Sequence, residues 1–277
     1  MITPTRKGKS TVHISPTPVM TIIDDSTSLS GTSAADHTTP TIVLVHGAWA
    51  DSSSWSAVVE RLRADGFAIR SIANPLQGVV ADTAYLSSYL AAIDGPIVLV
   101  GHSYGGAVIS NIDASAFDIR SLVFIAAFIP LIGETVGQLA AQSTPALPLV
   151  PVEVPDGVEV SIEEAGFRTA FAGDLSQAIA DNLAVAQRPA NVKAVSEPSV
   201  NEAFRSVPSW ALITRQDQAI NYDLQRHMVG RTDANTTEVD ASHAVMVSRP
   251  DAVADLIKQA ARPSHSHTPT ATAEGIS

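Results

Sequence analysis

One stretch of sequence decides the fold of this chain: Pro96-Ile97-Val98-Leu99-Val100, followed at once by Gly101-His102-Ser103-Tyr104-Gly105. The first half is an apolar run typical of a buried strand, and a helix-like segment begins after the second half. The second half fits the pattern G-x-S-x-G, in which a sharp strand-to-helix turn holds a serine in a strained backbone conformation. So short a pattern also arises by chance, but the preceding strand and the partner residues described below favour a functional Ser103.

A serine hydroxyl is a weak nucleophile until a base takes its proton, so the chain must also supply a histidine and an acid. Four of the eight histidines lie near the termini: His13, His37, His265 and His267. Two more belong to the motifs beside the serine, and one falls in an amphipathic helix: His46, His102 and His227. His243 remains, in a loop before the last helix, and we expect it to be the base.

The acid should follow a strand that lies between the serine and the histidine in the chain. Residues 208–214 are typical of a buried strand, and Asp217 lies in the turn after it. We therefore predict that Asp217 orients the imidazole and stabilises its protonated form. Glu134 is the best rival, because it follows an earlier strand. Three other carboxylates are more simply explained as solvated: Asp223, Asp233 and Asp240.

Negative charge that develops on a substrate oxygen needs two backbone N–H donors. We expect one from Tyr104, at the N-terminus of the helix after the serine, where the helix dipole also favours negative charge. We expect the other from Ala48, in the turn His46-Gly47-Ala48-Trp49 that follows a strand at 41–45. An ordinary strand-to-helix turn is the alternative for that segment. Trp49 and His102, beside these donors, are expected to contact the substrate.

These motifs resemble those of the α/β-hydrolase superfamily, and within it a branch of small bacterial esterase-like proteins similar to plant methylesterases and hydroxynitrile lyases. The matching segments span residues 40 to 262: His46-Gly47-Ala48-Trp49 with Trp55, Asn74-Pro75-Leu76, Gly101-His102-Ser103-Tyr104-Gly105-Gly106, Ala126-Ala127-Phe128-Ile129-Pro130 and Ser242-His243-Ala244. The resemblance implies a catalytic triad of Ser103, Asp217 and His243, beneath a helical cap.

Two departures from these relatives bear on the reaction. The similar lyases keep a threonine after the first histidine of the turn and a lysine beside the catalytic histidine, whereas this chain has Gly47 and Ala244. A cyanohydrin leaving group would lack its cationic partner, which disfavours lyase activity. Epoxide hydrolases and haloalkane dehalogenases use an aspartate where this chain has Ser103, so their chemistry is excluded.

The chain alternates predicted strands and helices, which indicates an α/β fold with a mostly parallel sheet flanked by helices. Strands are predicted at 41–45, 68–72, 97–101, 121–126, 208–214 and 235–239, and helices at 53–64, 81–93, 104–115, 222–230 and 250–261. Residues 131–200 break the alternation: a proline-punctuated apolar stretch precedes helical segments at 162–171 and 175–186. We expect them to form a cap inserted into an α/β-hydrolase domain at 40–262, with a plain connecting region as the alternative.

The terminal segments and the composition set further limits. Residues 1–39 are expected to be a partly disordered extension and 263–277 a disordered tail. The net charge of −11 disfavours nucleic acid, and no apolar run is long enough for membrane insertion. There is no cysteine. We expect a cytoplasmic monomer or homodimer, since no signal peptide is recognisable, and no metal or cofactor.

Together these features predict a serine hydrolase of the carboxylesterase type. We expect it to cleave small, uncharged, hydrophobic esters through an acyl-enzyme on Ser103, because little positive charge is available in the cap. Cleavage of a lactone, a thioester or a carbon–carbon bond by the same residues stays open. So does a ligand-binding receptor with a vestigial triad.

Overall fold

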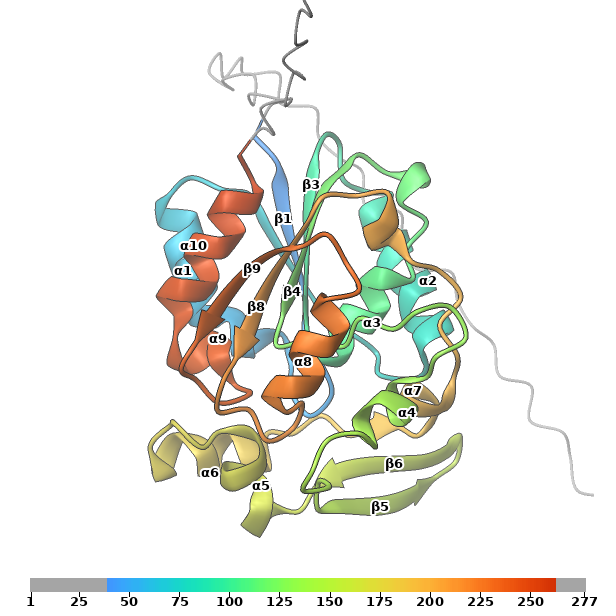
Figure 1. Cartoon of the computed structure of the whole chain (residues 1–277), viewed down its shortest axis with the longest axis vertical. Coiled ribbons are helices and arrows are strands. Elements are labelled where there is room, and N and C mark those ends of the chain that lie inside the picture. The colour runs from blue at the N-terminus through green and yellow to red at the C-terminus, as the bar shows by residue number, and fades with distance from the viewer. Residues whose placement is uncertain (1–38, 263–277) are drawn as a thin grey trace, which may run out of the picture. The chain divides into compact units, whose positions relative to one another are not determined.

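Six parallel strands form the central sheet within residues 39–262, the part of the chain that the computed structural model describes (Figure 1). They pair in the order β2-β1-β3-β4-β8-β9. Their bounds are β1 Thr41–Val45, β2 Ile69–Ile72, β3 Ile97–His102, β4 Ile119–Ile125, β8 Ser209–Thr214 and β9 Asn235–Val239. Each pairing is parallel. The predicted α/β fold with a mostly parallel sheet is therefore confirmed.

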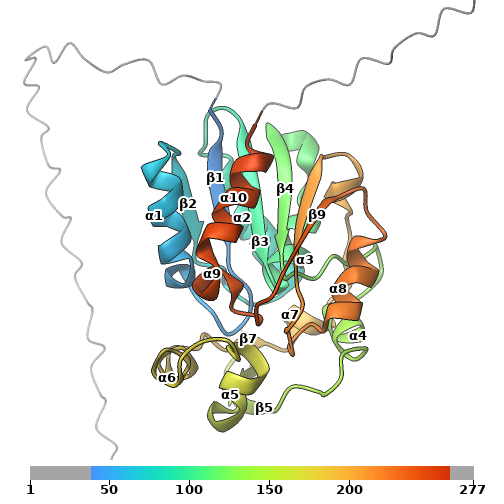
Figure 2. The same ribbon diagram turned by 60° about the vertical axis from the view of Figure 1, so that its left-hand side comes forward.

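Helices cover both faces of this sheet (Figures 1 and 2). One face carries α1 (Ser56–Ala64), α9 (Val245–Ser248) and α10 (Pro250–Ala260), and the other carries α2 (Val79–Leu90), α3 (Tyr104–Ser110) and α8 (Tyr222–Val229). Three single turns of 3-10 helix connect elements: η1 Ser52–Trp55, η2 Ala114–Ala116 and η3 Ala203–Arg205. Along β3, Val98 and Val100 face α1 and α10 while Leu99 faces α2 and α3. Burial on both faces explains why the strand has a continuous apolar sequence.

The cap lies at one end of the sheet, beyond the carboxyl ends of its strands (Figure 2). It contains α4 Val136–Ala140, β5 Leu149–Val154, β6 Gly157–Ile162, α5 Glu164–Phe171, α6 Gln177–Val185, β7 Ala190–Asn191 and α7 Lys193–Ser196. The helices predicted at 162–171 and 175–186 correspond to α5 and α6. The apolar stretch before them forms an antiparallel hairpin, β5-β6, to which β7 adds a third strand. The cap is thus helical with a small sheet that the sequence analysis did not predict.

Several helices begin or end at other residues than predicted from the sequence. The helix expected at 104–115 ends at Ser110, and the helix expected at 81–93 begins two residues earlier, at Val79. The predictions for residues 1–38 and 263–277 lie outside the described residues. Within 39–262, no helix combines the length and apolar character that crossing a bilayer requires.

Candidate active site

Ser103 stands in the sharp turn between β3 and α3 with a φ of 53° and a ψ of −124°. This left-handed backbone costs energy for a residue with a side chain and persists only where neighbours hold it. The neighbours are visible: the Ser103 N–H donates to Ile125 O at 3.2 Å, and its carbonyl accepts from Gly106 N and Phe128 N at 2.9 and 3.0 Å. The end of β4 therefore supports the strained turn from the side.

The two glycines that flank the turn, Gly101 and Gly105, lie too close to neighbouring backbone atoms to carry a side chain. A Cβ on Gly101 would lie 2.5 Å from the carbonyl oxygen of Gly105, and one on Gly105 would lie 2.5 Å from the carbonyl oxygen of Val45. Both distances are shorter than the van der Waals contact distance between a carbon and an oxygen atom. Strand, helix and the neighbouring strand β1 can meet here because neither position carries a side chain.

The three residues predicted as a triad converge on one another, although they come from distant parts of the chain. His243 Nε2 lies 2.8 Å from Ser103 Oγ, and His243 Nδ1 lies 2.7 Å from Asp217 Oδ2. Because a carboxylate only accepts, Nδ1 carries the proton and Nε2 is free to accept from the serine hydroxyl. The His243 side chain is fully buried and Ser103 is 3% exposed. This arrangement can transfer a proton from serine to imidazole.

Asp217 is surrounded by hydrogen-bond donors in addition to the histidine. Its Oδ1 accepts from the backbone of Ala219 and Ile220 at 2.8 and 2.9 Å. Its Oδ2 accepts from Thr214 Oγ1 at 2.9 Å and from Gln225 Nε2 at 3.0 Å. These contacts compensate the burial of a negative charge and fix the carboxylate against the imidazole. No local pattern in the sequence marks Gln225, because only the fold places this residue of α8 beside Asp217.

The rival acids have other partners or face solvent. Glu134 forms an ion pair with Arg231 at 2.7 Å, and Asp240 pairs with Arg215 at 3.2 Å. Asp223 and Asp233 are exposed. Among the carboxylates considered from the sequence, Asp217 alone is hydrogen-bonded to His243.

The turn after β1 passes directly against the serine. A Cβ on Gly47 would lie 2.5 Å from Ser103 Cβ, so only glycine fits there. The His46 ring holds the turn: its Nε2 accepts from Asn74 N at 3.0 Å, which leaves Nδ1 to donate to the Gly47 carbonyl at 2.8 Å. Burial lowers the pKa of His46 and favours this neutral form. The carbonyl and the next N–H of a trans peptide point in opposite directions, so the Ala48 N–H points away from His46. That orientation suits the donor role predicted for Ala48.

The other predicted donor, Tyr104, begins α3 and is anchored by its side chain. Its hydroxyl donates to Asp82 Oδ2 at 2.8 Å, and Asp82 Oδ1 accepts from Gln77 N at 3.0 Å. Burial raises the pKa of Asp82, and burial likewise raises the pKa of Tyr104. Asp82 was not recognised in the sequence, because a single aspartate in the first turn of a helix is usually a solvated residue.

His102, for which a substrate contact is predicted, lies in the core of the protein, with its ring beside that of Phe171. Its fully buried ring shares the α1 face of the sheet with Trp55, and its Nε2–H donates to the carbonyl of His243 at 3.0 Å. Burial lowers its pKa well below the usual value, with the neighbouring His243 acting in the same direction. The alternation of β3 explains the position, since His102 follows Val98 and Val100 on the same face. Its contacts are those of a support for the His243 loop.

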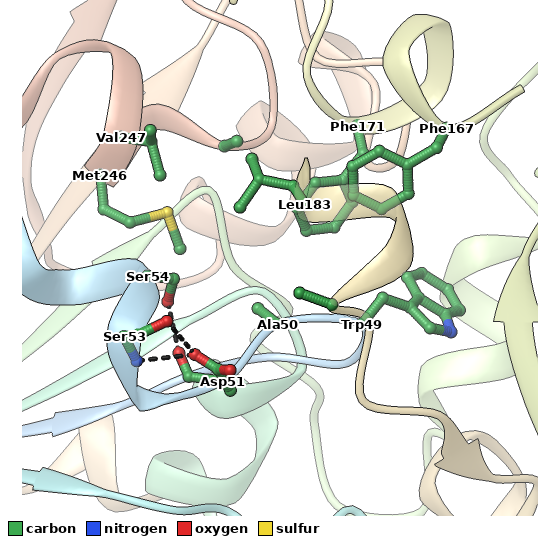
Figure 3. Close-up of a pocket in the computed structure, with 12 residues that line it drawn as sticks. Trp49, Ala50, Asp51, Ser53, Ser54, Phe167, Phe171, Leu183, Met246 and Val247 are labelled. Carbon is green, nitrogen blue, oxygen red and sulfur yellow. Dashed lines mark hydrogen bonds between the residues drawn. The ribbon is translucent and has the colours of Figure 1, made fainter. Parts of the chain in front are cut away.

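Beside the triad, the cap and the turn after β1 enclose an apolar pocket (Figure 3). Trp49, which is predicted to contact the substrate, lies in its wall. Phe171 joins pocket and triad, because its ring also packs edge-on against His243 at 4.7 Å between centroids. The full lining is Trp49, Ala50, Asp51, Ser53, Ser54, Phe167, Phe171, Leu183, Ala186, Ala244, Met246 and Val247. It includes one charged side chain, Asp51, and no cation.

Within residues 39–262, no group of three or more His, Cys, Asp or Glu side chains gathers in a way that could hold a metal ion.

A serine on a strained turn at the carboxyl end of a parallel sheet, in contact with a histidine and a buried aspartate, defines the class of α/β serine hydrolases. Comparison with known proteins agrees. The chain belongs to the alpha/beta hydrolase family, whose sequence profile matches residues 42–256. The predicted relationship is thereby confirmed, and so, at the level of the family, is the expectation of an esterase-type hydrolase.

Individual relatives are more distant. The carbendazim hydrolyzing esterase of Nocardioides sp. (strain SG-4G) is 34% identical over 119 residues, which are 37% of this chain and 48% of that protein. The matched part thus spans about half the length of this curated relative. Among solved structures, a pyrethroid hydrolase from Sphingobium faniae JZ-2 is similar with a TM-score of 0.67 and 20% identity, covering 80% of this chain and 97% of the other. Polyneuridine aldehyde esterase gives a TM-score of 0.69 with 17% identity, covering 80% and 98%. At these identities the two structures bear on the fold alone.

Proposed function

We propose that the protein is a serine hydrolase that cleaves small, uncharged, hydrophobic carboxylic esters. The observation that carries this proposal is the unbroken chain of hydrogen bonds from Ser103 Oγ through the His243 ring to Asp217. A buried serine that only stabilised the fold would need neither a histidine in the acceptor tautomer nor a carboxylate behind it.

In the proposed reaction, Ser103 Oγ attacks the ester carbonyl carbon while His243 Nε2 takes the hydroxyl proton. The oxygen of the tetrahedral intermediate carries the negative charge and accepts from the Ala48 and Tyr104 N–H groups. Collapse of the intermediate breaks the bond to the alkoxy oxygen, which takes the proton back from His243 and leaves as the alcohol. A water molecule, activated by the same imidazole, then cleaves the acyl-enzyme and releases the acid.

The pocket beside the triad supports this substrate class. Aromatic and aliphatic side chains dominate its wall, and it offers no cation to pair with an anionic substrate. Asp51 would repel such a substrate. The name of one relative, the carbendazim hydrolyzing esterase, adds carbendazim to the compounds to test.

A panel of p-nitrophenyl esters with graded acyl chains, together with lactones and thioesters, tests the proposal. We expect turnover of the uncharged short- and medium-chain esters, and loss of at least about ten-thousand-fold in kcat for Ser103→Ala with an unchanged circular dichroism spectrum. Retained ester turnover in that variant would refute the role of Ser103. Turnover of lactones or thioesters alone would reassign the substrate class.

A fluorophosphonate probe separates an enzyme from a ligand-binding receptor. Labelling of Ser103 together with ester turnover supports the hydrolase. Labelling of Ser103 without turnover of any compound in the panel would identify an activated serine in a receptor and would overturn the proposed function.

A further inference from the structure

Trp49 connects the turn that carries Ala48 to the cap at two points. Its backbone N–H donates to the carbonyl of Arg188 at 3.1 Å, in the segment that leads out of the cap. Its indole N–H donates to the carbonyl of Val160, in strand β6 of the cap hairpin, at 2.9 Å. The second bond joins residues 111 positions apart in the chain. One side chain thus links the cap sheet to the residue next to the proposed oxyanion donor.

The same cap segment holds a second turn of the core. The Asn191 N–H donates to the carbonyl of Leu76 at 2.9 Å, and the Arg188 side chain donates to the carbonyl of Pro75 at 3.3 Å. The turn that contains Pro75 and Leu76 is also hydrogen-bonded to the turn after β1, because Asn74 Nδ2 donates to the carbonyl of His46 at 3.1 Å. Two core turns and one cap segment therefore form a single hydrogen-bonded unit.

Backbone strain marks the same places. Four non-glycine residues between 39 and 262 have positive φ angles: Trp49 at 60°, Leu76 at 61°, Ser103 at 53° and Ala126 at 42°. Ser103 and Ala126 belong to the nucleophile turn and the strand end beside it. Of these four residues, Trp49 and Leu76 are the two whose backbones bond to the cap. Such conformations cost about 1–3 kcal/mol each and persist only when surrounding contacts hold them.

The serine and the histidine are covered in this arrangement. Ser103 is 3% exposed and His243 is 0% exposed, so the arrangement described is a closed one. A displacement of the cap that admits an ester would stretch the bonds from Trp49 to Val160 and Arg188. The backbone at Trp49 would then be free to relax from its left-handed conformation. Because Ala48 precedes it directly, that relaxation would turn the peptide between Ala48 and Trp49 and shift the backbone of Ala48, which carries the proposed donor N–H.

We propose that Trp49 is a positioning residue that couples closure of the cap to the orientation of the oxyanion donor Ala48. The inference rests on the proposed function for its catalytic consequence, but the coupling itself is a property of the fold. The donor is fully oriented when the cap is closed over a bound substrate. The His46 ring holds the peptide on one side of Ala48, and Trp49 holds the peptide on the other. Substrate binding and transition-state stabilisation are thereby linked.

Trp49 also lines the apolar pocket, so the experiment must separate positioning from simple packing. The test variant is Trp49→Phe, which keeps an aromatic ring and removes the indole N–H. The matched control is Phe167→Leu, a change in the same wall on α5. A more specific variant replaces Trp49 by its benzothienyl analogue, which keeps the shape of the indole and lacks only the N–H donor. If Trp49→Phe folds poorly, this variant tests the positioning role instead.

Two kinetic measurements carry the catalytic part of the test. For Trp49→Phe and for the benzothienyl protein, we expect kcat for p-nitrophenyl butyrate to fall about tenfold with KM changed less than about twofold, because a misplaced oxyanion donor weakens binding of the transition state alone. Affinity for a trifluoromethyl ketone, which forms a tetrahedral adduct, should fall in parallel. Phe167→Leu, which alters the packing of the pocket, should raise KM by a larger factor than it lowers kcat. A Trp49 variant that behaves like Phe167→Leu would overturn the proposal.

Amide hydrogen exchange of the full chain tests the coupling without turnover. In the Trp49 variants we expect peptides covering residues 46–50 and peptides covering β6 to exchange faster together, by about fivefold or more. The control should leave residues 46–50 unchanged. Unchanged exchange at 46–50, or faster exchange in the cap alone, would refute the coupling. If the wild-type protein hydrolyses none of the esters, the proposed function fails while this measurement still decides the coupling.

Discussion

The central sheet with its loops and the cap differ in how their residues are buried and held in place. In the sheet, the strands β1, β3 and β4 are almost completely buried, and each catalytic group is held by several hydrogen bonds. In the cap, the helices are 4 to 9 residues long, and strand β5 exposes half of Leu149, Val150 and Val152. We therefore expect the core to fix the proposed chemistry, and the cap, whose elements are shorter and more exposed, to be the part that moves and selects the substrate.

The edge of the cap sheet shows how an exposed apolar strand is kept from pairing with other chains. Pro151 lies in the middle of β5, where it pairs with Val160. A proline cannot donate a backbone hydrogen bond, so it weakens the outer edge as a template for a further strand.

The largest expected effect comes from the core. Asp217→Asn removes the carboxylate that selects the Nδ1-protonated tautomer of His243, and kcat should fall by about ten-thousand-fold. The fold should remain, because an amide can still accept from Ala219 and Ile220. The control is Asp240→Asn, an exposed acid on a neighbouring loop, for which kcat should stay within about twofold. Steady-state kinetics with p-nitrophenyl butyrate gives both values. Equal activity of the two variants would remove Asp217 from the mechanism.

A second prediction sets one glycine of the core against one of the cap. In Gly47→Ala the new Cβ would lie 2.5 Å from Ser103 Cβ, so the serine or the turn must shift, and kcat should fall about a hundredfold. In Gly173→Ala the nearest atom is 3.8 Å away, an ordinary contact, and kcat should not change by more than about twofold. If the cap glycine proved the more sensitive of the two, the assignment of chemistry to the core would need revision.

The buried histidines of the core predict a dependence of stability on pH. The pKa values of His46 and His102 are lowered from 6.5 by burial, so below that pH the unfolded chain binds protons that the folded chain does not. The free energy of unfolding should therefore be highest above pH 6.5 and fall as the pH drops below it, by up to about 1.4 kcal/mol per pH unit for each histidine.

Urea unfolding at several pH values between 5 and 7 measures this slope. His102→Gln keeps a donor for the His243 carbonyl and removes one titrating ring, so its slope should be smaller than that of the wild type. Comparing slopes avoids confusion with any change in overall stability. A slope unaffected by His102→Gln would mean that this ring is not neutral in the folded protein.

The parts that the sequence could predict are those in which a short local pattern fixes a backbone conformation. The G-x-S-x-G turn, the His46-Gly47 turn and the strand before Asp217 are of this kind, and together they indicated the fold and the three converging side chains. The face of the sheet that carries His102 could not be predicted, because a motif places a residue in the chain but not on a face of the sheet. Asp82 and Gln225 act through contacts across helices, which no local pattern encodes.

The cap hairpin was missed for a different reason. Strand β5 is exposed along most of its length, so it lacks the alternation of apolar and polar residues that marks a strand packed on one face. A turn signal was present: Pro155 and Asp156 lie between the paired residues Val154 and Gly157, and Gly157 has a φ of 129°. The prolines before it favoured an interpretation as an irregular loop.

The smallest expected effect belongs to the cap and sharpens its role in selecting the substrate. Leu183, on α6, is half-buried and lines the apolar pocket without contacting the triad. Leu183→Ala should raise KM for p-nitrophenyl butyrate about threefold to tenfold through lost apolar contact, with kcat unchanged, since one or two methylenes are worth about 1 kcal/mol each. The increase should be smaller for the acetate ester, because a shorter acyl group reaches less of the wall. An equal change for both esters would place the acyl group elsewhere and leave Leu183 beside the alcohol.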